Sequence, residues 1–228
     1  MRTCILALLT LFLALPAQAQ PADSSPWTIG HVLKQRSLED VDIGPDGKRV
    51  LWVKETPDPE ADKTQSDLYL TYRDDPHEGD STATIQLTRT GNNNDPRWSP
   101  NGHQIAFLSS RETDDEEASG TQIWRIDPRG GAPEAITSVE HGVQSVRWLS
   151  NKRLLFTARE KSSRYENYLD EQEDDTDAIE DTTLFRPVRL FTVNVETEEV
   201  TRLTENENQI TEFAPSPDGR YVVYDLKV

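Results

Sequence analysis

The stretch IGPDGKRVLWV, residues 43–53, is the first copy of a pattern that the chain repeats. It returns as WSPNGHQIAFL at 98–108 and as PSPDGRYVVY at 215–224, and a copy without the glycine, WLSNKRLLF, occupies 148–156. Proline sets φ for the second position of a turn, and glycine accepts positive φ at no steric cost. The β-branched and aromatic residues after each turn predict a strand buried on both faces. Each copy therefore predicts a turn that joins a short strand to a central one.

A second element follows each of the first three copies. Its apolar residues alternate in 67–71, 122–127 and 189–194, which is the pattern of a half-buried strand. Each of these strands leads through a polar turn into a short strand that ends in Leu87-Thr88, Ile136-Thr137 or Leu203-Thr204. One unit thus holds about four antiparallel strands in roughly 45 to 65 residues, which is typical of a β-propeller blade. A β-sandwich would show turn signals, but not this order of elements three times.

The sequence therefore predicts an all-β fold, a partial β-propeller of about three and a half four-stranded antiparallel blades over residues 41–228. The fourth copy reaches Val228 without a second hairpin. A repeat array buries each blade on its neighbours, so an open end would expose an apolar edge. Two interpretations follow: another segment completes the array, or this chain is a fragment of a longer protein, which we favour. The chain alone is expected to be marginally stable and to associate.

The first residues predict export. Arg2 gives a positive start, residues 5–15 are almost continuously apolar, and Ala17 and Ala19 form a small-x-small cleavage pattern. The apolar run is too short to span a bilayer, which takes roughly 20 residues, and a buried helix would need a polar face. We therefore expect a signal peptide at 1–19, a segment preceding the propeller at 20–40, and a periplasmic or secreted product. Cys4, the single cysteine, lies in the leader, so no disulfide or cysteine site is expected.

The charge of the chain argues against two classes of partner. Its formal net charge is -17. Such a chain repels nucleic acid and anionic membrane surfaces, so we expect no nucleic-acid partner and no membrane span. Acidity also keeps proteins soluble, and it does not by itself imply a basic substrate.

Four parts of the chain carry a resemblance to a known family. They are the stretch from Trp27 to Asp40, the SPNG and SPDG strands, residues 122–137 with their GGAPEAIT hairpin, and residues 193–198. In this order they resemble the N-terminal β-propeller of prolyl oligopeptidase family serine peptidases, especially the acylaminoacyl-peptidase and dipeptidyl-peptidase-like branch. The Ser-Pro-Asp-Gly repeat is also similar to that of TolB-like periplasmic propellers.

The peptidase resemblance implies a C-terminal α/β-hydrolase domain with a Ser-Asp-His triad, over which the propeller filters peptide substrates. A nucleophile of that type lies in Gly-x-Ser-x-Gly, and the chain contains no such pentapeptide. We therefore assign no catalytic residue and expect the chain to be inactive alone. The second hypothesis is a stand-alone TolB-like propeller that binds a protein or peptide partner. A third is an autonomous enzyme with a site that the sequence does not reveal.

Other residues give weak signals for chemistry. The histidines lack metal-ligand spacing, so surface positions are favoured over a zinc site; they are His31, His77, His103 and His141. The pairs Ser109-Ser110 and Ser162-Ser163 are not part of a Gly-x-Ser-x-Gly nucleophile elbow, and they are expected in loops. We predict no metal site, no cofactor-binding residue and no cofactor.

Two acidic stretches interrupt the units, at 114–117 and 166–181. They could form a cation-binding loop, but a solvated insertion is favoured because dense like charge does not pack. The tyrosines in 164–168 could anchor the second insertion against the blade. Residues 92–96, rich in asparagine, predict a loop. Four tryptophans, Trp52, Trp98, Trp124 and Trp148, are expected on strands that pack between blades.

Overall fold

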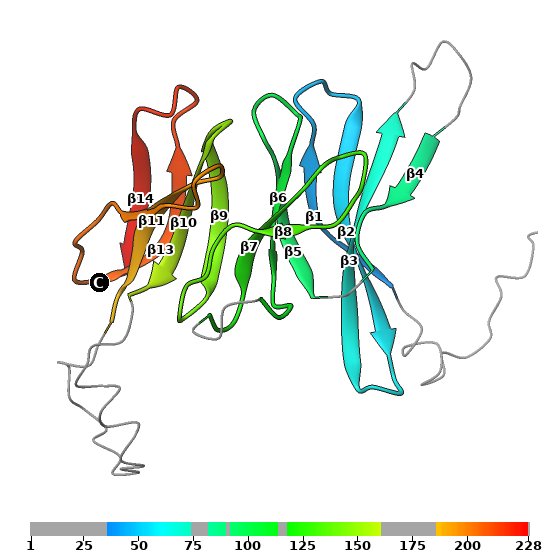
Figure 1. The fold of residues 1–228 in the computed structure, drawn as a ribbon, viewed down its shortest axis with the longest axis horizontal. Coiled ribbons are helices and arrows are strands. Elements are labelled where there is room, and N and C mark those ends of the chain that lie inside the picture. The colour runs from blue at the N-terminus through cyan, green and yellow to red at the C-terminus, as the bar shows by residue number, and fades with distance from the viewer. Residues whose placement is uncertain (1–35, 74–81, 90–91, 114–117, 161–185, 228) are drawn as a thin grey trace, which may run out of the picture.

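The structure, a computed structural model, describes residues 36–73, 82–89, 92–113, 118–160 and 186–227, and its regular elements in these ranges are strands. They form three four-stranded sheets and one two-stranded sheet. The sheets stand side by side along the long axis of the molecule (Figure 1). The all-β fold of antiparallel four-stranded blades is thus confirmed. In the described ranges we find no helix with the length and apolar character needed to cross a membrane.

The blades are numbered along the chain, and the strands of each blade pair in chain order. Blade 1 contains β1 (Ser37–Ile43), β2 (Arg49–Asp58), β3 (Lys63–Arg73) and β4 (Thr82–Gln86). Blade 2 contains β5 (Asn93–Trp98), β6 (Ile105–Ser109), β7 (Gln122–Ile126) and β8 (Glu134–Ala135). Blade 3 contains β9 (Val143–Ser150), β10 (Arg153–Arg159), β11 (Val188–Asn194) and β12 (Val200–Arg202). The half-blade contains β13 (Gln209–Pro215) and β14 (Val222–Lys227).

The repeated turns form where the sequence predicts them, between the first and second strands of a blade. Gly47 and Gly219 adopt φ of 69° and 66°, in the left-handed region that glycine enters without a Cβ clash. In the first turn the Asp46 Oδ1 accepts a hydrogen bond from the Lys48 backbone N–H at 2.9 Å. Local side-chain bonds of this kind explain why aspartate precedes glycine in the repeat.

The second strands are buried in blades 2 and 3 but exposed in the half-blade. All of β6 is buried, as are the five central residues of β10. The prediction that the strand after the last turn is buried on both faces is wrong. Val223 in β14 is 75% exposed, and Tyr224 and Leu226 are exposed as well. No described element packs against the outer side of this strand, so its apolar residues face solvent.

The hydrophobic cores lie between blades. One core joins blades 1 and 2, with members that run from Leu51 to Ile126. A second joins blades 2 and 3, with members from Ala106 to Val195. A smaller core of Leu155, Leu190 and Ile210 joins blade 3 to the half-blade. Each blade is therefore stabilised by burial against its sequence neighbours, as in other repeat architectures.

A threonine holds the outer strand in each complete blade. The backbone N–H groups of Leu68, Ile123 and Leu190 donate to the Oγ1 atoms of Thr88, Thr137 and Thr204, at 2.9, 2.9 and 3.0 Å. The residue before each threonine donates its backbone N–H to the carbonyl of the same partner, at 2.8 Å in all three blades. The Leu-Thr and Ile-Thr pairs noted in the sequence thus fix the third strand to the segment that ends the fourth.

Carboxylates on the inner strands span the joints between blades. Asp42 Oδ2 on β1 accepts from the Trp98 N–H on β5 at 2.8 Å. Asp95 Oδ2 on β5 accepts from the Val146 N–H on β9 at 3.0 Å. Trp148 Nε1 on β9 donates back to the Arg97 carbonyl at 2.9 Å. Because charge-assisted bonds to backbone N–H groups are strong, these contacts orient one blade on the next.

The prediction of a loop at residues 92–96 is wrong, because β5 starts at Asn93. The left-handed backbone expected of asparagine and aspartate is present, with φ of 58° at Asn92 and 45° at Asp95. At Asp95 it produces a shift in the pairing of β5 with β6 instead of a loop. Asn93 is fully buried, and its Nδ2 donates to the Ser66 carbonyl at 2.8 Å. Such buried bonding explains how a polar sequence enters a strand.

Several expectations concern residues outside the described ranges. These are the signal peptide at 1–19, Cys4, the segment from 20 to 35, His31, His77, Ser162-Ser163, the acidic stretches 114–117 and 166–181, and the tyrosines in 164–168. Strand β1 begins at Ser37, so the last residues of the segment 20–40 lie in blade 1.

Candidate functional site

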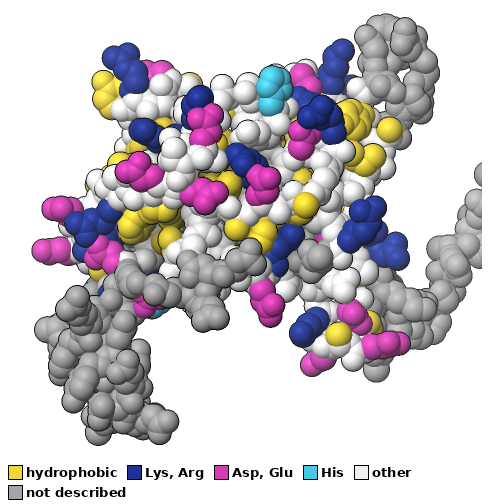
Figure 2. All heavy atoms as spheres, in the orientation of Figure 1, with side chains coloured by type: hydrophobic (Ala, Val, Ile, Leu, Met, Phe, Trp, Pro, Cys, Tyr) yellow, Lys and Arg dark blue, Asp and Glu magenta, His cyan; other side chains and the backbone are white. Residues whose placement is uncertain are grey.

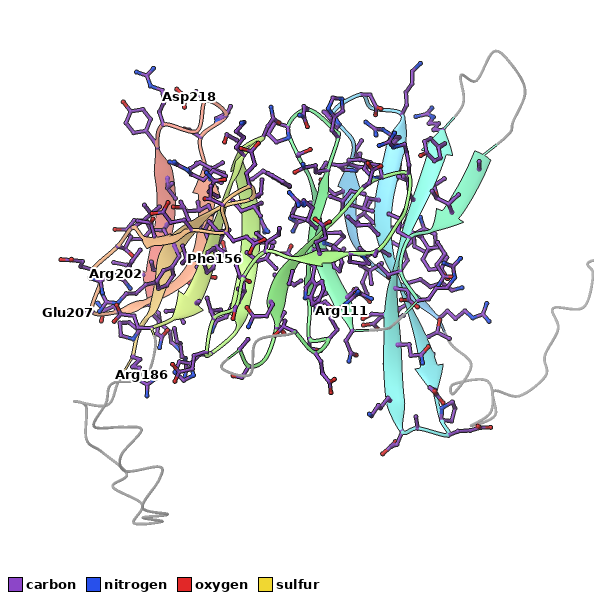
Figure 3. All side chains as sticks on the ribbon, viewed as in Figure 1. Arg111, Phe156, Arg186, Arg202, Glu207 and Asp218 are labelled. Atoms are coloured by element: carbon purple, nitrogen blue, oxygen red, sulfur yellow. The ribbon has the colours of Figure 1, made fainter. Side chains whose placement is uncertain are left out.

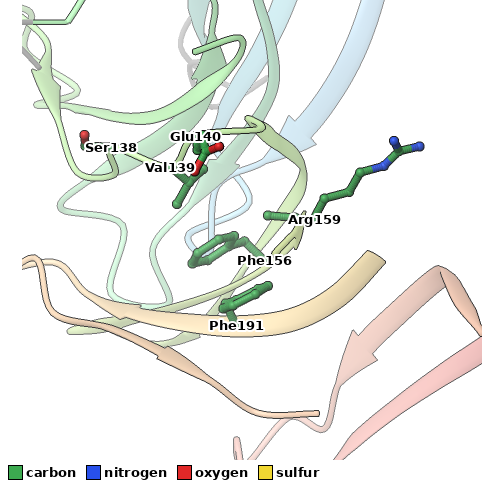
Figure 4. Close-up of a pocket in the computed structure, with 7 residues that line it drawn as sticks. Ser138, Val139, Glu140, Phe156, Arg159 and Phe191 are labelled. Atoms are coloured by element: carbon green, nitrogen blue, oxygen red, sulfur yellow. The ribbon is translucent and has the colours of Figure 1, made fainter. Parts of the chain in front are cut away.

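An apolar cavity of about 190 Å³ opens between blades 2 and 3, on the face where β10 leads toward β11. It is bounded by the linker between β8 and β9 and by residues of β10 and β11 (Figure 4). The lining residues are Ser138, Val139, Glu140, Phe156, Ala158, Arg159 and Phe191. Asp218, in the turn between β13 and β14, and Arg186, just before β11, lie at opposite ends of the strands (Figure 3).

Two phenylalanine rings form the floor of the cavity. Phe156 and Phe191 are directly opposite each other in the pairing of β10 with β11. Their ring centroids are 5.5 Å apart at an interplanar angle of 20°. Phe156 is fully buried, whereas Phe191 is partly exposed to the cavity. Val139 and Glu140 lie on one side of Phe156, and Phe191 lies on the other (Figure 4).

The acidic groups of the rim already have basic neighbours. Glu140 Oε1 lies 3.6 Å from His141 Nε2. Glu160, next to the cavity on the chain, pairs with Arg189 at 3.1 Å and with Arg202. Arg186, where the chain returns into β11, contacts His141. Each of these acids therefore already has neighbours of its own among the described residues.

Arg159 differs from these arginines. It lines the cavity and is exposed, and among the described residues its side chain forms no ion pair or hydrogen bond. In Figure 4 its guanidinium extends away from the ring pair, so that its aliphatic part borders the cavity. An arginine placed in this way can bind an acid from outside the described structure, because guanidinium groups pair readily with carboxylates.

A buried polar network lies between blades 1 and 2. Asn93 Nδ2 donates to Thr88 Oγ1 at 3.1 Å, and Arg111 Nη2 donates to Asn93 Oδ1 at 2.5 Å. The Arg111 guanidinium also lies 4.8 Å from the centroid of the Trp124 ring. Burial lowers the pKa of Arg111, and the charge of Asp67 acts in the opposite direction. Since its members bond to one another, this network serves the joint rather than an external ligand.

Two further hollows, of about 350 and 460 Å³, lie on the face of the turns, and both include His103 and Asp127. Arg129 donates to Asp127 from Nε at 2.9 Å and from Nη2 at 2.7 Å. These bonds lower the pKa of Asp127 from 3.8 to about 2. The acid here is bonded within its own turn, so the hollows contain little unpaired charge.

The candidate residues named from the sequence are not brought together. His103 lies in the turn between β5 and β6, and His141 lies beside Glu140 on the other face. The prediction that Ser109 lies in a loop is wrong, because it is the buried last residue of β6 and accepts from Arg111 Nε at 3.1 Å; Ser110 follows the strand and is exposed. Among the residues that the structure places, no group of three or more His, Cys, Asp or Glu side chains could hold a metal ion.

The tryptophans lie on strands, and three of them pack between blades. Trp98 and Trp124 belong to the core between blades 1 and 2, and Trp148 belongs to the core between blades 2 and 3. Trp52 instead stacks on Tyr69 of its own blade, with ring centroids 4.9 Å apart. None of the four lines the cavity.

Sequence reasoning missed the cavity and the carboxylates at the joints. The carboxylates between blades had a signal in the sequence: Asp40, whose Oδ2 accepts from the Asp95 N–H at 3.0 Å, and Asp95 each stand five positions before the proline of a repeated turn. The cavity gave no signal in the sequence, since Val139, Phe156 and Phe191 come from three separate segments and meet only after the blades pack.

By sequence, the chain is similar to parts of proteins named as peptidases. No family model matches it. It is 26% identical over 208 residues to the uncharacterized peptidase YuxL of Bacillus subtilis (strain 168), which covers 84% of this chain and 30% of that protein. It is 27% identical over 127 residues to the probable dipeptidyl-peptidase 5 of Aspergillus terreus, covering 51% of this chain and 17% of that protein. The chain thus spans less than a third of the length of these relatives. The resemblance to the propeller region of such peptidases, predicted from the sequence, is confirmed.

Solved structures support the fold. The uncomplexed acylaminoacyl peptidase of Pyrococcus horikoshii is similar with a TM-score of 0.54 and 16% identity, over 84% of this chain and 28% of that one. TolB from Acinetobacter baumannii is similar with a TM-score of 0.53 and 17% identity, over 82% of this chain and 37% of that one. At these identities the likeness concerns the β-propeller fold alone.

Proposed function

We propose that this chain is the propeller portion of an exported serine peptidase of the prolyl oligopeptidase family, where it restricts the access of peptides to a catalytic α/β-hydrolase domain. The observation that carries the proposal is the match to the peptidase YuxL, which extends over 84% of the chain. The catalytic residues would lie elsewhere in such a protein, because this sequence has no Gly-x-Ser-x-Gly.

The joints between blades are consistent with a rigid filter. Asp42 and Asp95 each bond a backbone N–H of the next blade, and the cores between blades are apolar. Opening such a joint would expose buried surface and unpaired polar groups, which is costly. A propeller built in this way would admit short or extended peptides and exclude folded proteins.

The first test is the coding sequence after codon 228. The proposal expects the frame to continue through further blade repeats into a Gly-x-Ser-x-Gly elbow. A stop codon at that point would overturn it. The product of the full frame should then hydrolyse a short peptide, and a variant with the elbow serine changed to alanine should not.

The filtering role needs a separate measurement. The full-length enzyme should cleave a short peptide efficiently and should cleave the same sequence poorly within a surface loop of a folded protein. Unfolding that carrier protein should restore cleavage. Equal kcat/KM values for the peptide and the folded carrier would contradict filtering without affecting the assignment as a peptidase.

Export is tested on the protein produced by its native leader. We expect removal of residues 1–19, so that the mature chain begins at Gln20. N-terminal sequencing after cell fractionation checks this, and an intact Met1 in the cytoplasmic fraction would contradict it.

The second candidate function is partner binding by a stand-alone propeller. The observation that favours it is the similarity to TolB, with a TM-score of 0.53. It requires the frame to stop after Val228, and it predicts no peptide hydrolysis by the purified product.

A further inference from the structure

The cavity between blades 2 and 3 combines an apolar interior with two charged residues at its edge, Arg159 and Glu140, and Glu140 already has neighbours of its own. Phe156 and Phe191 form its floor, and Arg159 stands at its mouth with no acid partner among the described residues. A ligand that fits both features has an apolar group and a negative group a short distance apart.

The volume of the cavity suits one large side chain. An apolar cavity of about 150 Å³ binds benzene in another protein. The present cavity, at about 190 Å³, therefore has room for one aromatic or branched aliphatic group. An incoming ring would contact Phe191, the partly exposed ring of the pair, and aromatic pairs attract each other beyond the effect of area burial.

The charged residues beside the cavity indicate where the negative group of a ligand would bind. Glu160 is engaged by Arg189 and Arg202, and Glu140 also has partners among its neighbours. These acids are therefore poor partners for Arg159. A carboxylate brought by a ligand would complete the pairing, and it would bind outside the cavity, where Figure 4 places the guanidinium.

We propose that this cavity binds the C-terminal residue of a peptide that ends in a large apolar side chain. The side chain lies against Phe191, and the terminal carboxylate binds Arg159. The choice of a peptide rests on the proposed function. The site itself lies on the propeller, so its binding is measured without reference to hydrolysis.

The experiment compares two probes on the full product of the reading frame. They are N-acetyl-Ala-Ala-Phe with a free carboxylate and the same peptide as its C-terminal amide, titrated by calorimetry. Ion pairs between exposed groups are weak, so the amide should bind about two- to fivefold more weakly than the acid. Equal dissociation constants, or no binding of the acid, would overturn the proposal.

Arg159→Gln is the variant and Arg153→Gln its matched control. Both arginines are exposed residues of β10, and only Arg159 lines the cavity. The Arg159→Gln protein should bind acid and amide alike, whereas Arg153→Gln should keep the preference for the acid. If the Arg159→Gln protein still preferred the free carboxylate to the amide, the proposal would be overturned. This holds even if a catalytic domain of the full product also binds the peptide.

Photolabelling locates the site independently of affinity. A peptide with a C-terminal diazirine analogue of leucine should label the tryptic fragments 154–159, 190–202 or 130–147, which contain Phe156, Phe191 and Val139. Labelling confined to other fragments would overturn the proposal. Failure of the proposed function would instead appear as a stop after codon 228 or as absent hydrolysis, so the two failures are distinguishable.

Discussion

At the scale of single residues, a threonine hydroxyl recurs at the same point of each complete blade. Thr137 shows the complete arrangement, because its Oγ1 accepts from the Ile123 N–H and donates to Gln122 Oε1, both at 2.9 Å. Thr137 is 4% exposed, so the Ile123 N–H and Gln122 Oε1 cannot bond water in place of the hydroxyl unless the backbone moves. A buried donor that loses its acceptor retains its full desolvation cost.

Thr137→Val should therefore lower the free energy of unfolding by about 1–3 kcal/mol, because valine keeps the shape of threonine and removes the hydroxyl. Urea denaturation followed by tryptophan fluorescence measures the loss. Thr201→Val is the control, since Thr201 is exposed on β12. Equal losses in the two variants would show that the hydroxyl of Thr137 has no special role.

Asp127 gives a prediction with a defined pH window. Hydrogen bonds from Arg129 lower its pKa from 3.8 to about 2, so the ionised form stabilises the folded turn. This contribution is complete above pH 3.8 and is lost as the pH falls toward 2. Asp127→Asn should cause a small loss of stability at pH 6, since solvent screens exposed pairs, and no loss near pH 2. Denaturation across this range checks it, and an Arg129→Gln background should abolish the difference.

At the scale of elements, the turns of neighbouring blades touch one another. Gly47 and Gly219 have the same left-handed backbone, but their surroundings differ. A Cβ on Gly47 would meet nothing within 4 Å, whereas one on Gly219 would lie 2.6 Å from the backbone oxygen of Leu149 in blade 3. The turn of the half-blade is therefore fitted against its neighbour.

Gly47→Ala should cost about 1–2 kcal/mol, the penalty for placing an L-residue in left-handed backbone. Gly219→Ala should cost more, because the new Cβ also pushes the turn away from Leu149. Amide hydrogen exchange should show faster exchange in β13 and β14 of Gly219→Ala and unchanged exchange there in Gly47→Ala. The same exchange in both variants would contradict the contact.

The elements follow from the sequence where local chemistry decides them. The hairpins of 43–53 and 98–108 and the strands at 67–71, 122–127 and 189–194 depend on turn residues and alternation, so they are predicted well. Residues 92–96 are not, because Asn93 is held in a strand by partners on β3 that no local pattern reveals. The cavity escapes prediction for the same reason, since the packing of blades 2 and 3 creates it.

At the scale of the whole molecule, apolar side chains remain exposed at both ends of the row of blades. Leu38, Val41 and Ile43 are exposed on β1, and Val223 and Leu226 are exposed on β14. Elsewhere, the view in Figure 2 shows basic and acidic side chains interspersed over the surface. Exposed apolar strands at a sheet edge promote pairing between molecules.

The chain purified alone should therefore associate as its concentration rises, and Val223→Lys should reduce the association by placing a charge on the exposed strand. Sedimentation velocity over a concentration series measures this. Thr201→Lys, on an exposed position of β12, is the matched control. A wild-type chain that stays a monodisperse, cooperatively melting monomer would contradict the prediction.

The order of the cores along the chain has a consequence for biosynthesis. The core between blades 1 and 2 draws its buried members from Leu51 to Ile126, and the next core extends only to Val195. A nascent chain can close the first core before the ribosome has added blade 3. Folding can then follow the order of translation, with each new blade settling onto a neighbour that is already formed.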